Sequence, residues 1–401
     1  MDRIQLDLSH ALEEHIGPEH GLRAAELAGL APAAAHAVRV LWSRRGQDLR
    51  WLDTEAVAAG HERILEWADE LRGRFRTLVV LGVGPAALPV QALRSALNSP
   101  FHNLTTPGDL PRLIVLDNID PDLVGEFLDC VDPSECLFHA VTHSGSTPAT
   151  LAQFQLMRAA LREALGDEAH RSRMVVTTGA GGGELRALAQ REGYASFDVP
   201  EGVPERFAAL SPAGLVPAAL LGIDTPGLLA GAQAMGELCL AEDPLVNPAL
   251  GWAAACQLLR SQHAKTIAVT LSYSTRLRDL GPWTAQLIAG ALHAPTPLSA
   301  VGVSDVHSQL PLWTVGARDK WFTTLSVEKY DHSLAVPGEA ETLGELFAAE
   351  REGTREALQR AGVPQIDLRF PSVNAHTLGQ YFQLQQIAVA LAAEFADLDV
   401  G

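Results

Sequence analysis

A run of hydroxyl side chains between an apolar segment and a helical pattern is the stretch of this sequence best suited to chemistry. Residues 142–150 read Thr-His-Ser-Gly-Ser-Thr-Pro-Ala-Thr. The apolar segment 137–141 predicts a buried parallel strand, and Leu151, Phe154 and Leu161 recur afterwards at helical spacing. A helix that begins here leaves unpaired backbone N–H groups at its positive end. The run therefore indicates an anion site, most simply for a phosphate monoester. The alternative is that its Ser and Thr residues only cap the helix.

Four segments, in order, resemble the glucose-6-phosphate isomerase family in its shorter bacterial form, which is built of sugar isomerase (SIS) domains. They are residues 79–84, 142–150, 203–215 and 304–310. The last two are the specific ones, because a glycine-rich turn such as 79–84 is common in many proteins. The resemblance implies an aldose–ketose isomerase that interconverts glucose 6-phosphate and fructose 6-phosphate through an enediolate, in glycolysis and gluconeogenesis.

The resemblance also implies roles for single residues. Arg206 would be the cation that stabilises the enediolate, since a guanidinium stays charged; otherwise it forms a surface ion pair with Glu201 or Glu205. His307 would open the sugar ring near neutral pH; otherwise it is a structural histidine. Gln286 would bind substrate, with a solvated position on its helix as the alternative.

The substrate grip would be formed by the hydroxyl run and by the glycine turn before it. The residues concerned are Gly84, Thr142, His143, Ser144, Ser146 and Thr147. His143 stands where the family usually has a lysine. A neutral imidazole would weaken the electrostatic part of the grip, and protonation by a bound dianion would restore it.

The sequence departs from the family at the residue that should carry the proton. Aligning Trp283 and Gln286 with the family's helix places Gly290 at the position of the base glutamate. Loss of a general base lowers the rate by roughly 10²–10⁴-fold, so we expect slow turnover unless His293, or else Glu205, supplies a base. The alternative function is a catalytically impaired phosphosugar-binding protein of the same fold.

Three further departures accompany this one. Pro85-Ala86 replaces a Gly-Ser pair, Ala149 replaces an acidic residue, and the family's terminal segment with an active-site lysine is absent before Gly401. The glycine-rich stretches do not indicate nucleotide binding. Residues 82–84 lack the third glycine of a dinucleotide fold, and residues 179–183 lack the Lys-Ser/Thr of a P-loop and are interpreted as a flexible turn.

Strands and helices alternate over residues 78–200, which predicts an α/β fold with doubly wound parallel sheets. The predicted strands are 78–81, 113–116, 137–141, 174–177, 266–271 and 321–327. We expect three regions: an N-terminal helical segment (1–70), a first sugar isomerase domain (71–208), and a second (209–401) that ends in a buried helix over about 378–395.

Composition limits the partners. The 401-residue chain carries a net charge of −18, which argues against nucleic acid or an anionic membrane as a partner. Its four cysteines lack metal-like spacing, and we expect neither metal nor cofactor. Buried thiols and the lack of a signal peptide favour the cytoplasm. The resemblance implies a homodimer, in which the segment with His307 reaches the neighbouring subunit's site.

Overall fold

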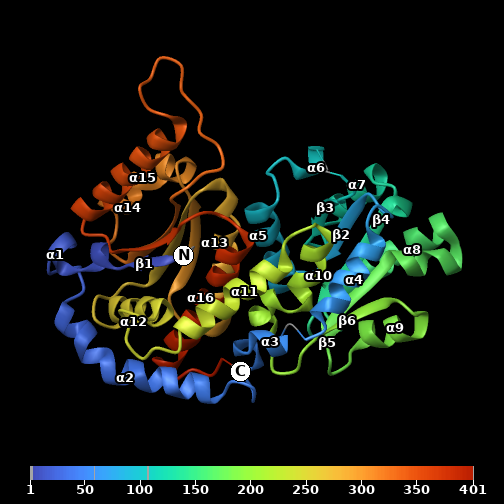
Figure 1. Cartoon of the computed structure of the whole chain (residues 1–401), viewed down its shortest axis with the longest axis horizontal. Coiled ribbons are helices and arrows are strands. Elements are labelled where there is room, and N and C mark those ends of the chain that lie inside the picture. The colour runs from blue at the N-terminus through green and yellow to red at the C-terminus, as the bar shows by residue number, and fades with distance from the viewer. Residues whose placement is uncertain (1–2, 58, 106–107, 401) are drawn as a thin grey trace. The chain divides into compact units, whose positions relative to one another are not determined.

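The computed structural model describes residues 3–57, 59–105 and 108–400, and the chain divides into two compact units (Figure 1). The first unit comprises residues 45–229; the second comprises residues up to 44 together with 230–400. The predicted boundaries at residues 70 and 208 stay a prediction about independently folding domains.

The first unit is built on a five-stranded parallel sheet in the order β3-β2-β4-β5-β6. Its strands are β2 (Thr77–Leu81), β3 (Arg112–Leu116), β4 (Cys136–Thr142), β5 (Met174–Gly179) and β6 (Ala195–Val199). Its helices are α3 (Thr54–Val57), α4 (His61–Leu71), α5 (Leu88–Leu97), α6 (His102–Thr105), α7 (Pro121–Cys130), α8 (Pro148–Ala169), α9 (Glu184–Glu192), α10 (Pro212–Leu220) and the start of α11 (Thr225–Leu238). Because β2 and β4 are parallel neighbours, the turns that follow them lie at one edge of the sheet.

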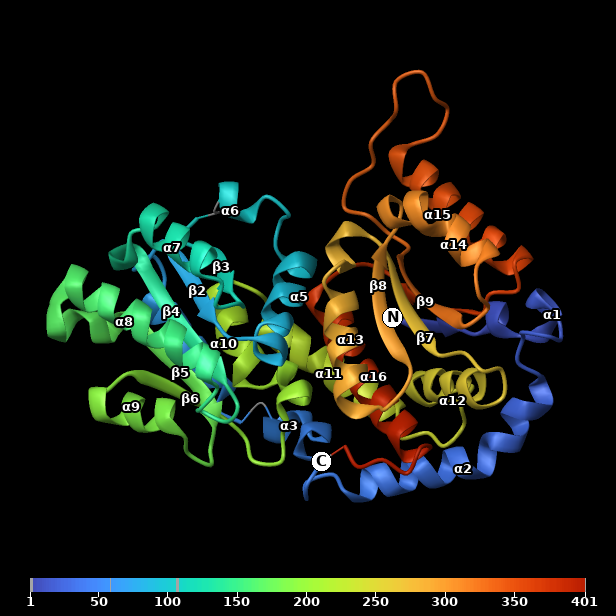
Figure 2. The ribbon, with the colours of Figure 1, turned by 180° about the vertical axis from the view of Figure 1, so that it is seen from behind.

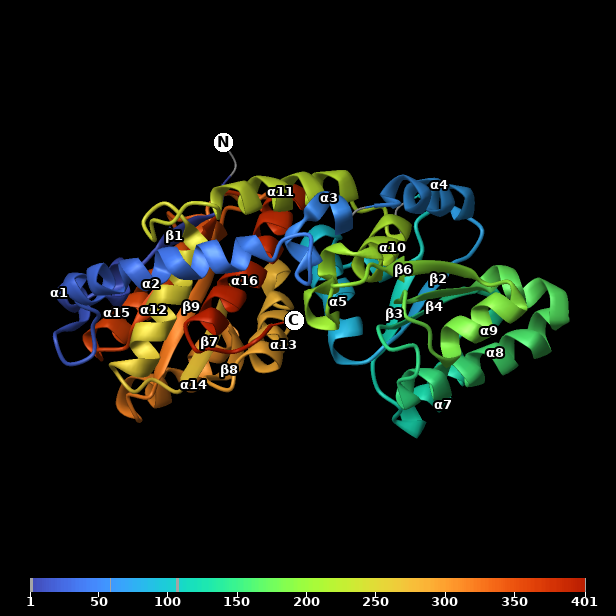
Figure 3. The same cartoon turned by 90° about the horizontal axis from the view of Figure 1, so that it is seen from below.

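Helices cover both faces of this sheet (Figure 3). The connections from β3 to β6 all advance in one direction, which places α7, α8 and α9 on one face. Phe127 of α7, Phe154 of α8 and Leu188 of α9 belong there to one buried apolar cluster with Phe138 of β4. The fully buried strand β4 therefore holds the start of α8 in a fixed place.

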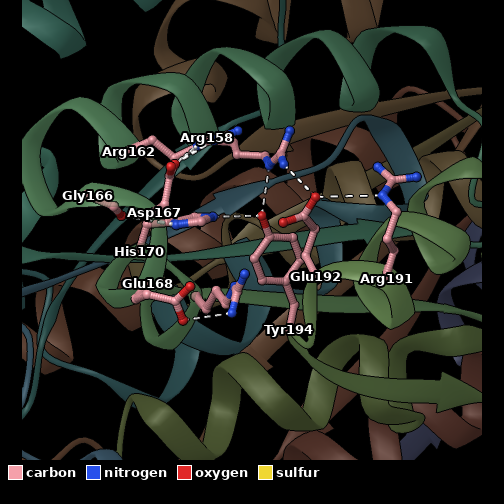
Figure 4. Close-up of polar contacts among 10 residues, drawn as sticks. Arg158, Arg162, Gly166, Asp167, Glu168, His170, Arg191, Glu192 and Tyr194 are labelled. Atoms are coloured by element: carbon pink, nitrogen blue, oxygen red, sulfur yellow. Dashed lines mark hydrogen bonds and ion pairs between the residues drawn. The ribbon is translucent and has the colours of Figure 1, made fainter.

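The far end of α8 is fixed by a polar network (Figure 4). Arg158 donates from Nε to the Tyr194 hydroxyl (2.8 Å) and from Nη2 to Glu192 (2.7 Å). His170 Nε2 lies 3.0 Å from the same hydroxyl, just beyond a break in the helix at Gly166. These bonds join α8 to the end of α9 and to the residue before β6.

The second unit also contains a five-stranded sheet, in the order β1-β10-β9-β7-β8. Its strands are β1 (Gln5–Asp7), β7 (Ile267–Tyr273), β8 (Thr296–Val301), β9 (Lys320–Val327) and β10 (Gln365–Phe370); only β1 among these runs antiparallel to its neighbour. Its helices are α1 (Glu13–Ile16), α2 (Ala24–Ser43), the rest of α11, α12 (Pro248–Ser261), α13 (Leu280–Ala291), α14 (Ser304–Val315), α15 (Leu343–Arg360) and α16 (Ala375–Glu394). Figure 2 shows α14 and α15 on one face of the sheet and α12, α13 and α16 on the other.

The predicted fold class, parallel α/β with two sheets, is confirmed. The expectation of helices alone over residues 1–70 is wrong at β1, which pairs with β10. Strands β6, β8 and β10 were not predicted either, because they interrupt their apolar pattern with polar residues such as Asp198, Ser299 and Asp367. Within the described ranges, no helix is both long and apolar enough to cross a bilayer.

Candidate active site

Three hydroxyl side chains form a compact group where β4 meets α8. Thr142, the last residue of β4, is buried, and its Oγ1 lies 2.7 Å from Oγ1 of Thr147 and 3.5 Å from Oγ of Ser144. Ser144 Oγ is 3.4 Å from Thr147 Oγ1 and accepts the backbone N–H of Ser146. The parallel sheet thus brings together the hydroxyls that the sequence singled out.

The helix that begins here keeps its first N–H groups available. Thr147 is the N-cap residue of α8, yet its side chain makes no capping bond, and its hydroxyl is bonded to Thr142 instead. The capping alternative therefore does not describe Thr147. A helix start of this kind suits an anion.

The glycine run at 179–183 packs against this loop near its two ends, and its interpretation as a flexible turn stays a prediction. The backbone N–H of Gly179 donates to His143 O, and that of Leu185 donates to Gly145 O, each at 2.9 Å. A Cβ on Gly145 would lie 2.8 Å from Gly182 O, and a Cβ on Gly183 would clash with Ser144 O. Both glycines have positive φ. Ser146 also faces this segment, 3.5 Å from the N–H of Glu184.

Gly84 lies in the neighbouring turn. It follows β2, adopts a φ of +54°, and has no atom within 4 Å of where a Cβ would stand. Its exposed backbone therefore lies at the same edge of the sheet as the three hydroxyls, and the space next to its Cα is open.

The segment with Arg206 is attached to the loop through His143. Nε2 of His143 donates to Val203 O at 3.0 Å, so one N–H of the imidazole is used within the protein. Arg206 is half-buried, and its guanidinium carbon lies 5.4 Å from the ring centroid of Phe207. Burial raises the pKa of the neighbouring Glu205 carboxyl, and His143 partly offsets that rise.

Gln286, Gly290 and His307 belong to the second unit. Both amide atoms of Gln286, on α13, are buried, and neither has a hydrogen-bond partner among residues 3–57, 59–105 and 108–400. An unsatisfied amide of this kind is unfavourable unless a ligand completes it. Gly290 is exposed near the end of α13, and His307 is exposed on α14. The exposed His293 follows α13.

Sequence reasoning missed two features. The role of Gly183 was signalled only by a glycine run, which has many interpretations. A second group, Asp7, His10 and Asp367, offers three potential metal ligands within 4.8 Å of one another, against the expectation of no metal site. No spacing rule could join residues so far apart in the sequence.

Two mostly parallel sheets flanked by helices, with a hydroxyl-lined helix start at the carboxyl edge of one sheet, define an α/β protein whose helix start suits an anion. Solved structures share the fold. A hypothetical protein of Thermus thermophilus has a TM-score of 0.86 at 30% identity and covers 98% of this chain and 94% of its own. A glucose-6-phosphate isomerase from Chlamydia trachomatis has a TM-score of 0.75 at 20% identity, and the match covers 97% of this chain and 77% of that structure. No family model matches the chain.

Curated sequences give the family. The glucose-6-phosphate isomerase of Rubrobacter xylanophilus is 36% identical over 390 residues, which are 93% of this chain and 89% of the relative. The glucose-6-phosphate isomerase of Carboxydothermus hydrogenoformans is 34% identical over 377 residues, which are 88% of this chain and 80% of the relative. The chain belongs to the glucose-6-phosphate isomerase family.

Proposed function

We propose that this protein interconverts glucose 6-phosphate and fructose 6-phosphate, a step of glycolysis and gluconeogenesis. The observation that carries the proposal is the cluster of three hydroxyls, from Thr142, Ser144 and Thr147, at a helix start without a side-chain cap. The chain that carries this cluster belongs to the glucose-6-phosphate isomerase family. A phosphate ester accepts hydrogen bonds from hydroxyls and free backbone N–H groups, and the helix dipole favours its charge.

The remaining steps are assigned to charged and amide side chains. Arg206 would stabilise the enediolate, because its charge does not depend on pH. Gln286 would bind the sugar through its amide, which lacks a hydrogen-bond partner among the residues that the structure describes. His307 would open the ring, and Gly84 would let the sugar approach the backbone closely.

The proton between the two sugar carbons needs a carrier other than Gly290. Glu205 is the better candidate: it is adjacent to Arg206, interacts with His143 of the loop, and has a pKa raised by burial. A carboxylate with a raised pKa is a stronger base than an ordinary glutamate. His293, the first choice from sequence, is exposed and follows α13.

A second candidate function is phosphosugar binding without turnover. It is favoured by one observation, the glycine in place of the base on α13. Both functions use the same loop, so binding alone does not separate them.

The test is a coupled assay that reads glucose 6-phosphate formed from fructose 6-phosphate. We expect product, and a loss on the order of 10²-fold in Arg206→Gln from removal of transition-state stabilisation. Arg191→Gln, an exposed arginine on α9, is the matched control and should keep the parent rate. Binding of fructose 6-phosphate without any product would favour the second function.

We further propose a cytoplasmic homodimer. All four cysteines are free thiols, as suits a reducing compartment. Helix α14, which carries His307, also exposes Leu312 and Val315, and exposed apolar side chains of this kind favour a protein interface.

A further inference from the structure

The imidazole of His143 is the ring in the hydroxyl loop 142–150, and its place in the first unit is fixed by the neighbouring strand. His143 is half-buried, and its backbone carbonyl accepts the N–H of Gly179 at the end of β5. A Cβ on Gly179 would lie 3.6 Å from Cε1 and 3.7 Å from Nε2 of the imidazole. The ring therefore lies against this glycine, at the carboxyl edge of the sheet.

One nitrogen of the imidazole is occupied by the protein. Nε2 lies 3.0 Å from the carbonyl oxygen of Val203. Because a carbonyl only accepts, Nε2 carries a proton and donates it. Val203 is 1% exposed, and no backbone N–H among the residues that the structure describes donates to this carbonyl. Loss of the imidazole would leave a buried acceptor without its partner, which is unfavourable. The N–H at Nε2 is thus committed to Val203.

The segment that carries Arg206 is attached to its surroundings at three points, and the imidazole supplies one of them. Before Arg206, the carbonyl of Gly202 accepts the backbone N–H of Arg50 at 3.0 Å. After it, the ring of Phe207 stacks on Trp51, with the centroids 4.3 Å apart. These two attachments do not involve the imidazole. We therefore expect the segment to stay folded when the side chain of the loop is changed.

Glu205 and Arg206 follow the Val203 carbonyl closely in the chain. Pro204 stands between them and Val203, with its φ held at −59° by its ring. A movement of the Val203 carbonyl is therefore transmitted to both charged residues. Glu205 also interacts with His143 directly: burial raises the pKa of its carboxyl, and the charge and the backbone N–H of His143 oppose that rise.

We propose that His143 is a positioning residue, which places Arg206 and Glu205 relative to the hydroxyl loop and leaves the phosphate to the hydroxyls and backbone N–H groups. The inference rests on the proposed function, because that function gives Arg206 and Glu205 their roles. It differs from the expectation that a protonated His143 takes over the grip of a lysine. A displacement of about 1 Å can lower a rate on the order of 10²-fold, so one hydrogen bond at this point is important.

Three roles of His143 predict three different results. If His143 were a phosphate ligand, its replacement would weaken the binding of every phosphorylated molecule. If it only satisfied a buried carbonyl, its replacement would lower stability and leave ligand binding unchanged. A positioning residue affects ligands that reach Arg206 and leaves the binding of phosphate alone as it is.

Two variants and two probes separate these roles. The amide nitrogen of Gln is as many bonds from Cα as Nε2 of His, so His143→Gln can still donate to Val203. The amide of Asn is one bond shorter, so His143→Asn is polar but cannot reach. The first probe is inorganic phosphate, which contacts the loop only. The second is a phosphosugar hydroxamate, a planar anionic analogue of the enediolate that also reaches Arg206.

Calorimetry on the full chain gives the decisive comparison. We expect equal phosphate affinity in the parent and both variants. The hydroxamate should bind His143→Asn about tenfold more weakly than the parent, and His143→Gln should recover most of the affinity. Weaker phosphate binding in both variants, equal hydroxamate binding in both, or a parent that binds the hydroxamate no more tightly than phosphate would overturn the proposal.

These measurements do not require turnover, so the two proposals fail separately. If fructose 6-phosphate is not converted but the hydroxamate pattern holds, the proposed isomerase function fails and the placement of Arg206 by His143 stands. If the sugar is converted and the variants do not differ in hydroxamate binding, the positioning role fails alone.

Nuclear magnetic resonance of the ¹⁵N-labelled parent needs no variant that must fold. The imidazole signals of His143 are assigned by their loss in His143→Gln. We expect a proton on Nε2 both without ligand and with inorganic phosphate, because the bond to Val203 does not depend on the ligand. An unprotonated Nε2 in either state would contradict the proposal.

Discussion

At the scale of single residues, the proposed function rests on the cluster of three hydroxyls at the start of α8. Residue types and spacing indicated Thr142, Ser144 and Thr147 as an anion site or as helix caps, and the resemblance to a phosphosugar isomerase family favoured the anion site. The structure joins these hydroxyls within 3.5 Å. The pairing of Asp7 with Asp367 gave no such signal, because it depends on tertiary contact between the two ends of the chain.

Removing two of these hydroxyls should weaken substrate binding. A hydrogen bond to a charged group contributes about 1.5–3 kcal/mol, so the double variant Ser144→Ala, Thr147→Ala should bind fructose 6-phosphate on the order of 10²-fold more weakly by calorimetry. Ser172→Ala, an exposed serine far along the chain from the loop, is the control. Unchanged affinity in the double variant would contradict the role of this loop in substrate binding.

Glu205 gives a prediction about pH. Its pKa is raised, so it stays protonated to a higher pH than an ordinary glutamate, and the base form appears as pH increases through that raised value. Proton abstraction should therefore increase with pH over a range above the usual carboxyl range. Glu205→Gln should abolish abstraction, whereas the exposed Glu201→Gln should leave the profile as it is. If Glu205→Gln has the same pH profile as the parent, a residue other than Glu205 is the base.

At the scale of elements, apolar runs predicted β2, β3, β4, β5, β7 and β9, and polar interruptions hid β6, β8 and β10. The edge strand β8 exposes half of its side chains, and β10 directs Asp367 and Arg369 into a cavity. Periodicity cannot identify a strand whose inward face is polar. The close packing of Gly183 was not predictable for a related reason: it depends on the loop after another strand.

Gly183 provides the test at this scale. Its φ is +104°, and a Cβ would meet the carbonyl of Ser144. Gly183→Ala should lower the free energy of unfolding by roughly 1–3 kcal/mol from backbone strain and should weaken phosphosugar binding by displacing the loop. Gly181→Ala is the matched control, since no atom lies within 4 Å of its Cβ position. Urea denaturation measures the stability of both variants, and calorimetry measures their phosphosugar binding. Equal stability and equal affinity in the two variants would contradict the role of Gly183 in holding the loop.

At the scale of the whole molecule, alternation of strands and helices was enough to predict a two-sheet α/β protein. The division of the chain was not predictable in the same way, since β1 completes a sheet whose other strands begin beyond residue 260. A three-residue strand carries too little pattern to show its partner.

The proposed homodimer can be tested at the exposed apolar side chains of α14. Val315 is 82% exposed, and so is Leu104 of α6. If α14 forms the interface, Val315→Asp should shift the protein from dimer to monomer in sedimentation velocity, and Leu104→Asp should not. A monomeric parent at micromolar concentration would contradict the homodimer and weaken the role of His307.

The central claim, that this chain catalyses isomerisation, is tested most directly by proton exchange. Fructose 6-phosphate incubated with the enzyme in heavy water gains deuterium whenever a base removes a proton from the sugar carbon, even when net conversion is slow. We predict that recovered sugar carries deuterium and that Glu205→Gln stops the exchange. Saturated binding of the sugar with no deuterium in the recovered material would contradict the account and leave a phosphosugar-binding protein.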